Sequence, residues 1–327
     1  MTAPSDPGRP PVALLLPGQG SQYQGMATGL YGHEQAFTEA VDEVFELIGP
    51  DADAVRADWI SDHPVVPVDH VTRSQVLLFT IDYAISRQLA DWKVEPAAVL
   101  GHSAGELVAA TLAGVFSLAD AVTLMWERIN RWAQAPAGGM LAVAARPEQV
   151  EPMLDGGVVV GIVNSPTQLI LAGPSAALAR VEGTLRAEGF TCRTVPATTG
   201  FHSPMLAELA DSTLPLVEKA EARQPELAFY SGYTTTRLTL RDVKDPRLWA
   251  GHPVAPVLFW PALGTLLSDG DFRLVEAGPG QCLSTVARRH PAVARGGSEV
   301  FAALPARAMG PEADRRALHK LADSLAG

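Results

Sequence analysis

A glycine-bounded serine between an apolar strand and an apolar helix constrains the fold of this chain most. Residues 95–115, EPAAVLGHSAGELVAATLAGV, predict a buried strand, a sharp turn and a helix in that order. Residues 101–105 have the pattern G-x-S-x-G, in which small residues let the chain turn abruptly and hold Ser103 in a strained conformation. The free N–H groups of the following helix would face Ser103 and stabilise a developing oxyanion. The pattern predicts a nucleophilic serine on an α/β scaffold.

Two other stretches support an α/β fold class with a parallel sheet. Residues 12–16, VALLL, and residues 272–276, FRLVE, are short apolar strands that both run into glycine-rich turns. Residues 139–198 differ, because their pattern gives strand, helix, strand, strand, helix, strand, which is the ferredoxin-like order. We therefore expect a large α/β-hydrolase-like domain (12–136 and 199–327), an inserted ferredoxin-like subdomain (137–198) and a flexible tail (1–11).

The composition excludes several function classes. The chain has 327 residues and a net charge of −11, which gives it no global attraction to nucleic acid or to an anionic membrane. Its two cysteines form neither a disulfide framework nor a zinc ribbon. The N-terminal residues lack the layout of a signal peptide, and no apolar run is long enough to span a membrane. We expect a soluble, cytoplasmic protein without a metal site.

A serine needs a base to take its proton, and His202 is the best candidate. It lies in GFHSPM, residues 200–205, at the predicted exit of the small subdomain. His102 adjoins the serine but should point elsewhere and act as a packed neighbour. The other histidines lie in polar or proline-rich contexts and are interpreted as surface or structural residues: His33, His63, His70, His252, His290 and His319.

Five motifs occur in an order that resembles a known enzyme family. They are LPGQGSQ (16–22), GHSAGE (101–106), Arg128, GFHSPM (200–205) and EAGPG (276–280). This order is similar to that of malonyl-CoA:acyl-carrier-protein transacylases and of polyketide synthase acyltransferase domains. The resemblance extends from about residue 12 to about residue 310.

The resemblance implies a role for each matched residue. Ser103 would carry the acyl group as an ester, and His202 would be the base, oriented by a backbone carbonyl. The backbone N–H groups of Gln19 and Ala104 would form the oxyanion hole. Arg128 would hold the free carboxylate of malonate, for which a planar guanidinium is suited. The remaining residues expected to contact substrate are Gln75, Asn164 and Phe201.

The resemblance also implies a reaction and its partners. Acyl transfer would be ping-pong, from acyl-CoA to the phosphopantetheine thiol of an acyl carrier protein, in polyketide or fatty acid biosynthesis. Coenzyme A and phosphopantetheine thioesters would be substrates, with no cofactor bound permanently. Because no ketosynthase or carrier segment is present, we expect the protein to act in trans on separate carrier proteins. We also expect a monomer.

Departures from the family pattern keep other interpretations open. Ala104 follows the nucleophile where many malonyl enzymes have a larger residue, Val76 replaces a proline, and Trp126 and Trp132 add bulk to the helix of Arg128. One alternative is an acyltransferase that moves a bulkier starter, such as an aminoacyl group, between two carrier proteins. Another is an editing thioester hydrolase. A mid-chain His202 disfavours an ordinary α/β-hydrolase, whose histidine lies near the C-terminus.

Overall fold

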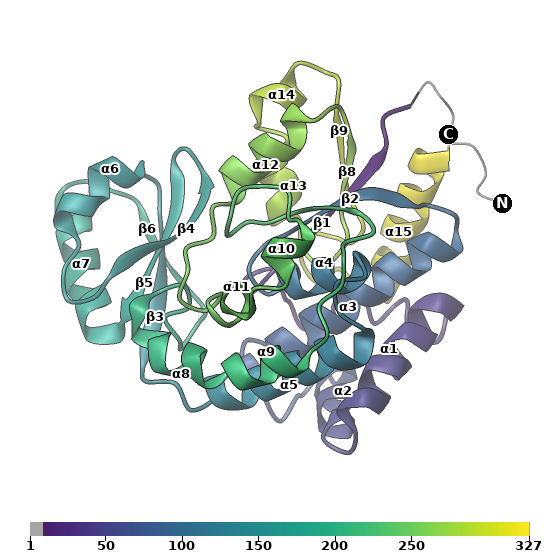
Figure 1. Ribbon diagram of the computed structural model, residues 1–327, viewed down its shortest axis with the longest axis horizontal. Coiled ribbons are helices and arrows are strands. Elements are labelled where there is room, and N and C mark those ends of the chain that lie inside the picture. Colours follow the sequence, from purple (N-terminus) through teal and green to yellow (C-terminus); the bar gives the residue numbers. More distant parts are fainter. Residues whose placement is uncertain (1–8, 327) are drawn as a thin grey trace.

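The structure, a computed structural model, describes residues 9–326 and contains two β-sheets (Figure 1). The predicted tail falls largely on residues 1–8, which lie outside the described residues. Its last two residues are held in place, because the carbonyls of Pro10 and Pro11 accept hydrogen bonds from the side chain and backbone of Arg273. The strands are β1 (Val12–Leu16), β2 (Pro96–Gly101), β3 (Gly138–Val143), β4 (Val159–Ser165), β5 (Gln168–Pro174), β6 (Cys192–Val195), β7 (Ala228–Tyr230), β8 (Arg273–Glu276) and β9 (Glu299–Ala302).

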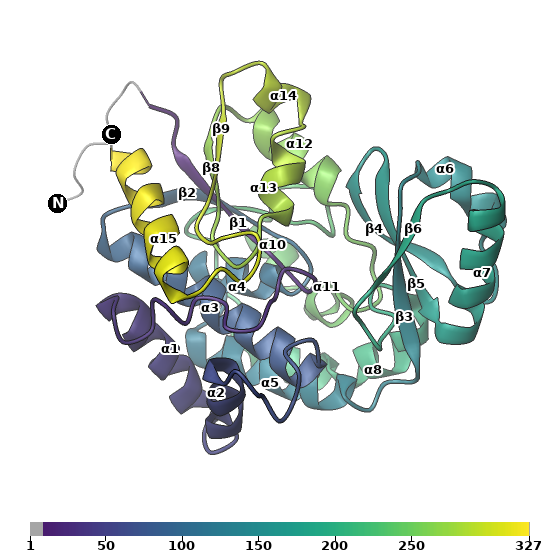
Figure 2. The ribbon, with the colours of Figure 1, turned by 180° about the vertical axis from the view of Figure 1, so that it is seen from behind.

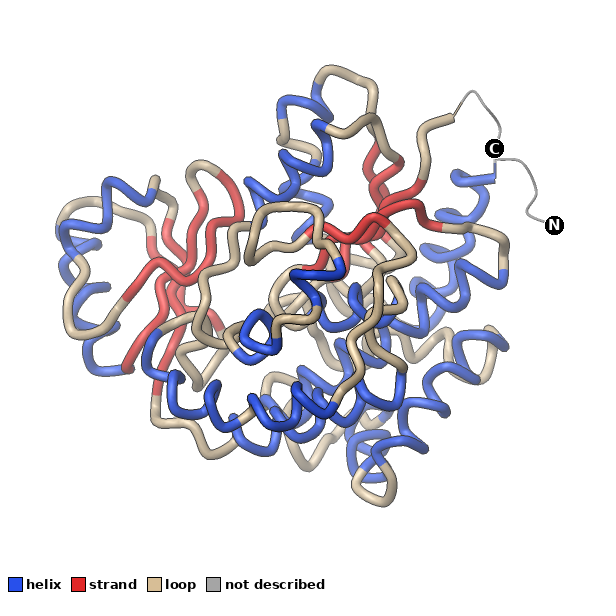
Figure 3. Tube along the Cα trace, viewed as in Figure 1, coloured by secondary structure: helices blue, strands red, loops and turns tan. Residues whose placement is uncertain are grey.

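Helices make up most of the remaining structure, as Figure 3 shows. None of the helices in the described part of the chain is long and apolar enough to cross a membrane. The helices are α1 (Gln35–Ile48), α2 (Ala52–Ile60), α3 (Val71–Asp91), α4 (Gly105–Leu112), α5 (Leu118–Trp132), α6 (Pro147–Val150), α7 (Ser175–Ala187), α8 (Ala207–Ser212), α9 (Leu214–Lys219), α10 (Leu240–Val243), α11 (Pro246–Ala250), α12 (Phe259–Ser268), α13 (Cys282–Ala287), α14 (Pro291–Ala294) and α15 (Pro311–Ala326).

The larger sheet is parallel throughout and has the order β7-β2-β1-β8-β9. Its central strand β1 is buried on both faces, as its continuous apolar sequence predicts. Leu14 and Leu16 point into a core formed with α1, α3, α4, α5 and α15. Ala13 and Leu15 point to the opposite face, where α12 and α13 cover the sheet. Figure 2 shows the first of these helix layers from behind.

The smaller sheet is antiparallel and has the order β4-β5-β3-β6. Its elements run β3, α6, β4, β5, α7, β6 along the chain, which is the ferredoxin-like order that the sequence predicts. α7 covers one face and closes a separate apolar core around residues such as Leu141, Leu169 and Val181. In Figure 1 this unit lies to one side of the larger sheet. The predicted boundaries, 137 and 198, bracket the sheet, and the division into domains stays a prediction.

Two backbone hydrogen bonds join strand β4 of the smaller sheet to the segment that precedes α12 on the larger sheet. Val163 on β4 donates to the carbonyl of Val257, and Val257 donates to the carbonyl of Gly161, both at 2.8 Å. Val257 belongs to the segment between α11 and α12. This segment also supplies the carbonyls that hold His202, so the small subdomain is tied directly to the region of the predicted nucleophile.

Candidate active site

Ser103 lies in a sharp turn between β2 and α4. Its φ is +54°, a left-handed conformation that is strained for a residue with a side chain. The glycines on either side permit the turn: a Cβ on Gly101 would lie 2.2 Å from the Cα of Glu106, and one on Gly105 would lie 2.2 Å from the carbonyl of Leu16. The N-terminus of α4 consequently starts beside Ser103, as the G-x-S-x-G pattern predicts.

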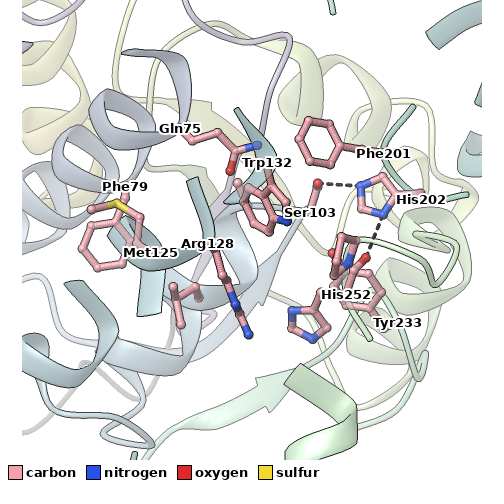
Figure 4. A pocket seen from close by; sticks show the side chains of 13 residues that line it. Gln75, Phe79, Ser103, Met125, Arg128, Trp132, Phe201, His202, Tyr233 and His252 are labelled. Carbon is pink, nitrogen blue, oxygen red and sulfur yellow. Dashed lines mark hydrogen bonds between the residues drawn. The ribbon is translucent and has the colours of Figure 1, made fainter. Parts of the chain in front are cut away.

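His202 is hydrogen-bonded to the predicted nucleophile. Its Nε2 lies 2.7 Å from the Oγ of Ser103, although the two residues are 99 positions apart in sequence (Figure 4). His202 also has a positive φ, +64°, and its N–H donates to the carbonyl of Pro253 at 2.7 Å. Two strained residues from distant segments therefore face each other, which is typical of functional sites.

The other ring nitrogen of His202 fixes its protonation state. Nδ1 lies 3.1 Å from the carbonyl oxygen of His252 and 3.0 Å from that of Ala255. Carbonyl oxygens only accept, so Nδ1 carries the proton and Nε2 is free to accept from the Ser103 hydroxyl. Burial, followed by the nearby His102, lowers the pKa of His202 to about 4. The imidazole is therefore neutral and ready to act as a base at neutral pH.

A pocket opens beside Ser103 and holds most of the predicted substrate-binding residues (Figure 4). In that view the apolar side chains of Phe79 and Met125 lie opposite His252 and Tyr233. Ala104 also lines it, with only a methyl group beside the nucleophile. The lining residues are Gln75, Phe79, Ser103, Ala104, Leu107, Met125, Arg128, Trp132, Phe201, His202, Tyr233, His252 and Pro253.

Arg128 brings a buried positive charge to this pocket. It lies on α5, which begins after Ser117, whose hydroxyl accepts from the N–H of Asp120 at 3.1 Å. Its Nη2 donates to the carbonyl of Trp249 at 2.9 Å, and the residue is only 4% exposed. Burial lowers the pKa of Arg128 to about 10, so it remains charged at neutral pH. No carboxylate forms an ion pair with Arg128 among residues 9–326, which leaves its charge available for a ligand.

His252, interpreted from the sequence as a surface or structural residue, is not on the surface. It is 7% exposed, it lines the pocket, and its ring stacks on Tyr233 with centroids 4.0 Å apart and planes 6° apart. Burial, followed by Arg128 and His202, lowers its pKa well below the usual value, so His252 is neutral. Tyr233 is a second pocket residue that the sequence patterns do not reveal. Neither residue stands in a recognisable motif. Both reach the pocket through contacts between segments that are far apart in the sequence.

Asn164 does not line this pocket. Its Oδ1 lies 2.8 Å from Nε2 of His102, so it links β4 to the turn that carries Ser103. Gln75 does line the pocket, and its Nε2 donates to the side chain of Gln19 at 3.4 Å. Phe201 packs edge-to-face on Trp132 with centroids 5.4 Å apart, which narrows one side of the pocket.

A second, larger cavity borders His102, the residue before the predicted nucleophile, and has a volume of about 1310 Å³ including open solvent. The loop after β1 and the turn residue His102 line one wall, and β-strands of the small subdomain line another. Asn164 and Arg193 contribute polar groups from the subdomain. The cavity thus lies between the two units and reaches Gln19, a predicted oxyanion-hole residue.

Glu106 supports the turn from behind. It is fully buried and accepts hydrogen bonds from the hydroxyl of Ser231 and, at 3.0 Å, from the N–H of Gly232. Burial raises the pKa of Glu106 to about 8, so the carboxyl group is largely neutral at pH 7. It therefore joins α4 to the chain after β7 without a buried charge.

We expect Glu106→Gln to cost at most about 1 kcal/mol of unfolding free energy at pH 7, because the amide replaces a neutral acid. Glu106→Ala should cost about 3 kcal/mol, because it leaves a buried hydroxyl and N–H unpaired and creates a cavity. Urea unfolding of the three proteins measures both values. Equal losses for Gln and Ala would contradict a neutral Glu106.

Comparison with known proteins assigns the chain to a family. The model of the acyl transferase domain family matches residues 14–300. The chain belongs to the acyl transferase domain family. This match confirms the membership that the five sequence motifs predict. The matched residues include Ser103, Arg128 and His202, so the whole pocket lies within the family domain.

Relatives of this acyl transferase domain occur in large synthases. A component of the phenolphthiocerol/phthiocerol polyketide synthase of Mycobacterium tuberculosis is 32% identical over 280 residues, which are 86% of this chain and 19% of that protein. The chain thus spans about a fifth of the length of that relative. A protein of Streptomyces orinoci, part of the spectinabilin polyketide synthase system, is 31% identical over 85% of this chain and 13% of its own.

Solved structures confirm the predicted fold class. The acyltransferase domain from the second module of the salinomycin polyketide synthase has a TM-score of 0.87 and 31% identity, covering 97% of this chain and 73% of that one. The malonyl CoA-acyl carrier protein transacylase from Clostridium perfringens has a TM-score of 0.83, covering 97% of each chain. At 23% identity, that likeness concerns the fold alone.

Proposed function

We propose that the protein transfers a malonyl-type acyl group to the phosphopantetheine thiol of an acyl carrier protein, through an ester on Ser103. The observation that carries this proposal is the 2.7 Å contact between Ser103 Oγ and a neutral His202 whose Nδ1 proton is held by two carbonyls. Such a pair needs no carboxylate to set its tautomer. The site resides in a member of the acyl transferase domain family, which makes acyl transfer the reaction class.

In the first half-reaction, the Oγ of Ser103 attacks the thioester carbonyl while its proton moves to Nε2 of His202. The new C–O bond forms, the C–S bond breaks, and the leaving thiolate takes the proton from Nε2. The backbone N–H groups of Gln19, in the loop after β1, and of Ala104, at the start of α4, would stabilise the negative charge on the oxygen of the intermediate. The second half-reaction reverses these steps with the carrier thiol as nucleophile.

The buried charge of Arg128 supports the proposal that the acyl group carries a carboxylate. A guanidinium buried without an anionic partner among the described residues is costly, and a carboxylate from the substrate would compensate it with charge-assisted hydrogen bonds. Gln75 and Phe201 would contact the same acyl group from the pocket wall. An aminoacyl starter offers no carboxylate and would leave the charge of Arg128 unpaired, so this alternative is disfavoured.

The second cavity fits the arm of the thioester. It is lined by Gln19 and by His102, which precedes Ser103, and by strands of the small subdomain, so a pantetheine chain could enter between the two units. Asn164 lies there and not in the acyl pocket, so we assign it to the arm or to positioning His102. Acyl-CoA and the acyl carrier protein would use this route in turn.

A transfer assay tests this function. The protein is incubated with malonyl-CoA and a carrier protein bearing its phosphopantetheine arm, and both products are followed by mass spectrometry. The proposal predicts malonyl-carrier protein together with free coenzyme A. Release of free malonate without loading of the carrier would instead support the editing hydrolase.

The pKa of His202 makes a separate prediction for the rate of Ser103 acylation. Only neutral His202 accepts a proton, so a pKa lowered from 6.5 to about 4 moves the loss of activity to lower pH. We expect the acylation rate to stay nearly constant from about pH 8 to about pH 5.5. Stopped-flow acylation measures it, with circular dichroism in the same buffers to exclude unfolding. Half-loss near pH 6.5, the ordinary pKa of a histidine, would contradict the buried, neutral imidazole.

A further inference from the structure

Unpaired buried nitrogens gather in the acyl pocket. Seven buried side-chain nitrogen and oxygen atoms have no hydrogen-bond partner among residues 9–326, and three of them belong to residues that line this one pocket. They are Nε of Arg128, Nε1 of Trp132 and Nε2 of His252. Because proteins pair nearly all buried polar atoms, a concentration of unpaired ones in a cavity indicates a ligand with matching groups.

A distal carboxylate accounts for only one of the three. It would pair with the guanidinium of Arg128, which already uses Nη2 to hold the carbonyl of Trp249. Trp132 and His252 would still lack partners. Trp132 follows Arg128 by one helical turn on α5, so both side chains emerge from the same face of that helix. His252 comes from the segment after α11 and lies on another side of the pocket (Figure 4).

These two groups require complementary chemistry. The indole N–H of Trp132 only donates a hydrogen bond. His252 is neutral, and its Nε2 accepts or donates according to the tautomer. A hydroxyl group satisfies both, because it accepts from the indole and exchanges a hydrogen bond with the imidazole. Hydrogen or a methyl group at the same position would satisfy neither.

The two ends of the bound acyl group determine where such a hydroxyl group would lie. Ser103 would bind the carbonyl carbon and Arg128 the distal carboxylate, so the α-carbon of a malonyl unit would lie between them. Trp132 lines the pocket beside both residues (Figure 4). Its edge-to-face contact with Phe201, with centroids 5.4 Å apart, limits the space there to a small substituent.

We propose that the preferred acyl group is a malonyl unit with a hydroxyl on its α-carbon, recognised by Trp132 and His252. This inference rests on the proposed function, since it assumes an acyl ester on Ser103 and a carboxylate on Arg128. The tryptophan and the histidine are then specificity-determining residues, and Tyr233 holds the histidine ring by stacking on it.

The test compares the malonyl, methylmalonyl and hydroxymalonyl thioesters of pantetheine. Methyl and hydroxyl groups are of similar size, so their ratio of kcat/KM for acylation of Ser103 reports hydrogen bonding and not volume. We expect at least about a tenfold preference for the hydroxyl compound over the methyl compound. Trp132→Phe and His252→Leu should each lower this ratio at least about fivefold, while Trp126→Phe, on the same helix but outside the pocket, should keep it.

The outcomes separate the inference from the function on which it rests. Equal or faster acylation by the methylmalonyl compound, with malonyl still transferred to Ser103, would overturn the hydroxyl preference and leave acyl transfer intact. A wild-type preference that persists in both variants would overturn the assignment to Trp132 and His252. Acylation by none of the three thioesters would overturn the proposed function itself.

Discussion

His202→Ala lowers the rate of acyl transfer to a carrier protein by about 10⁴-fold or more, because Ser103 then lacks a base. Of the neighbouring groups, Nε2 of His102 is hydrogen-bonded to Asn164, and the backbone carbonyls that orient His202 are too weakly basic to accept the proton. The measurement is loading of a carrier protein from malonyl-CoA under single-turnover conditions.

A matched control separates this loss from a general effect of removing a histidine. His319 is exposed and bonded to Glu34 on the surface, so His319→Ala should transfer at the wild-type rate. Thermal unfolding of His202→Ala checks that the protein still folds. A loss below about tenfold in a folded variant would show that another group deprotonates Ser103.

Arg128→Ala lowers kcat/KM for malonyl transfer by about 10²- to 10³-fold, the loss typical of a buried charge pair deprived of one partner. Acetyl transfer should change far less, because an acetyl group offers no carboxylate to Arg128. Steady-state kinetics with malonyl-CoA and acetyl-CoA measure this shift in selectivity. Arg128→Lys should recover part of the malonyl activity but not the bidentate geometry.

Arg131→Ala is the matched control for that experiment. Arg131 lies on the same helix, but it is partly exposed and pairs with Glu127, so its loss should leave selectivity unchanged. Equal losses for malonyl and acetyl in Arg128→Ala would mean that Arg128 only stabilises the pocket. That result would reopen the alternative in which a bulkier neutral acyl group is transferred.

Local sequence patterns predict the scaffold well because they depend on neighbouring residues. The continuous apolar sequence of β1, the elbow around Ser103 and the order of elements in the small subdomain all appear in the structure. Each follows from short-range geometry: buried parallel strands are apolar on both faces, and an abrupt turn needs glycines.

The pocket can be predicted only where a motif carries the residue. His202 stands in GFHSPM and is predicted, whereas His252 and Tyr233 stand in no motif and are not. Their positions depend on packing between segments distant in sequence, such as the contact of Arg128 with the carbonyl of Trp249, 121 residues away. For Asn164, family resemblance names the residue as a substrate contact, whereas its hydrogen bond to His102 is seen only in the structure.

The most direct test of the account is the intact mass of the protein after brief incubation with malonyl-CoA, followed by peptide mapping. We expect a mass increase of one malonyl group on the peptide that contains Ser103, and no increase for Ser103→Ala. Ser212→Ala, which removes an exposed serine on α8, should be labelled like the wild type. Transfer to the carrier by Ser103→Ala, or a malonyl group on any other residue, would contradict the account.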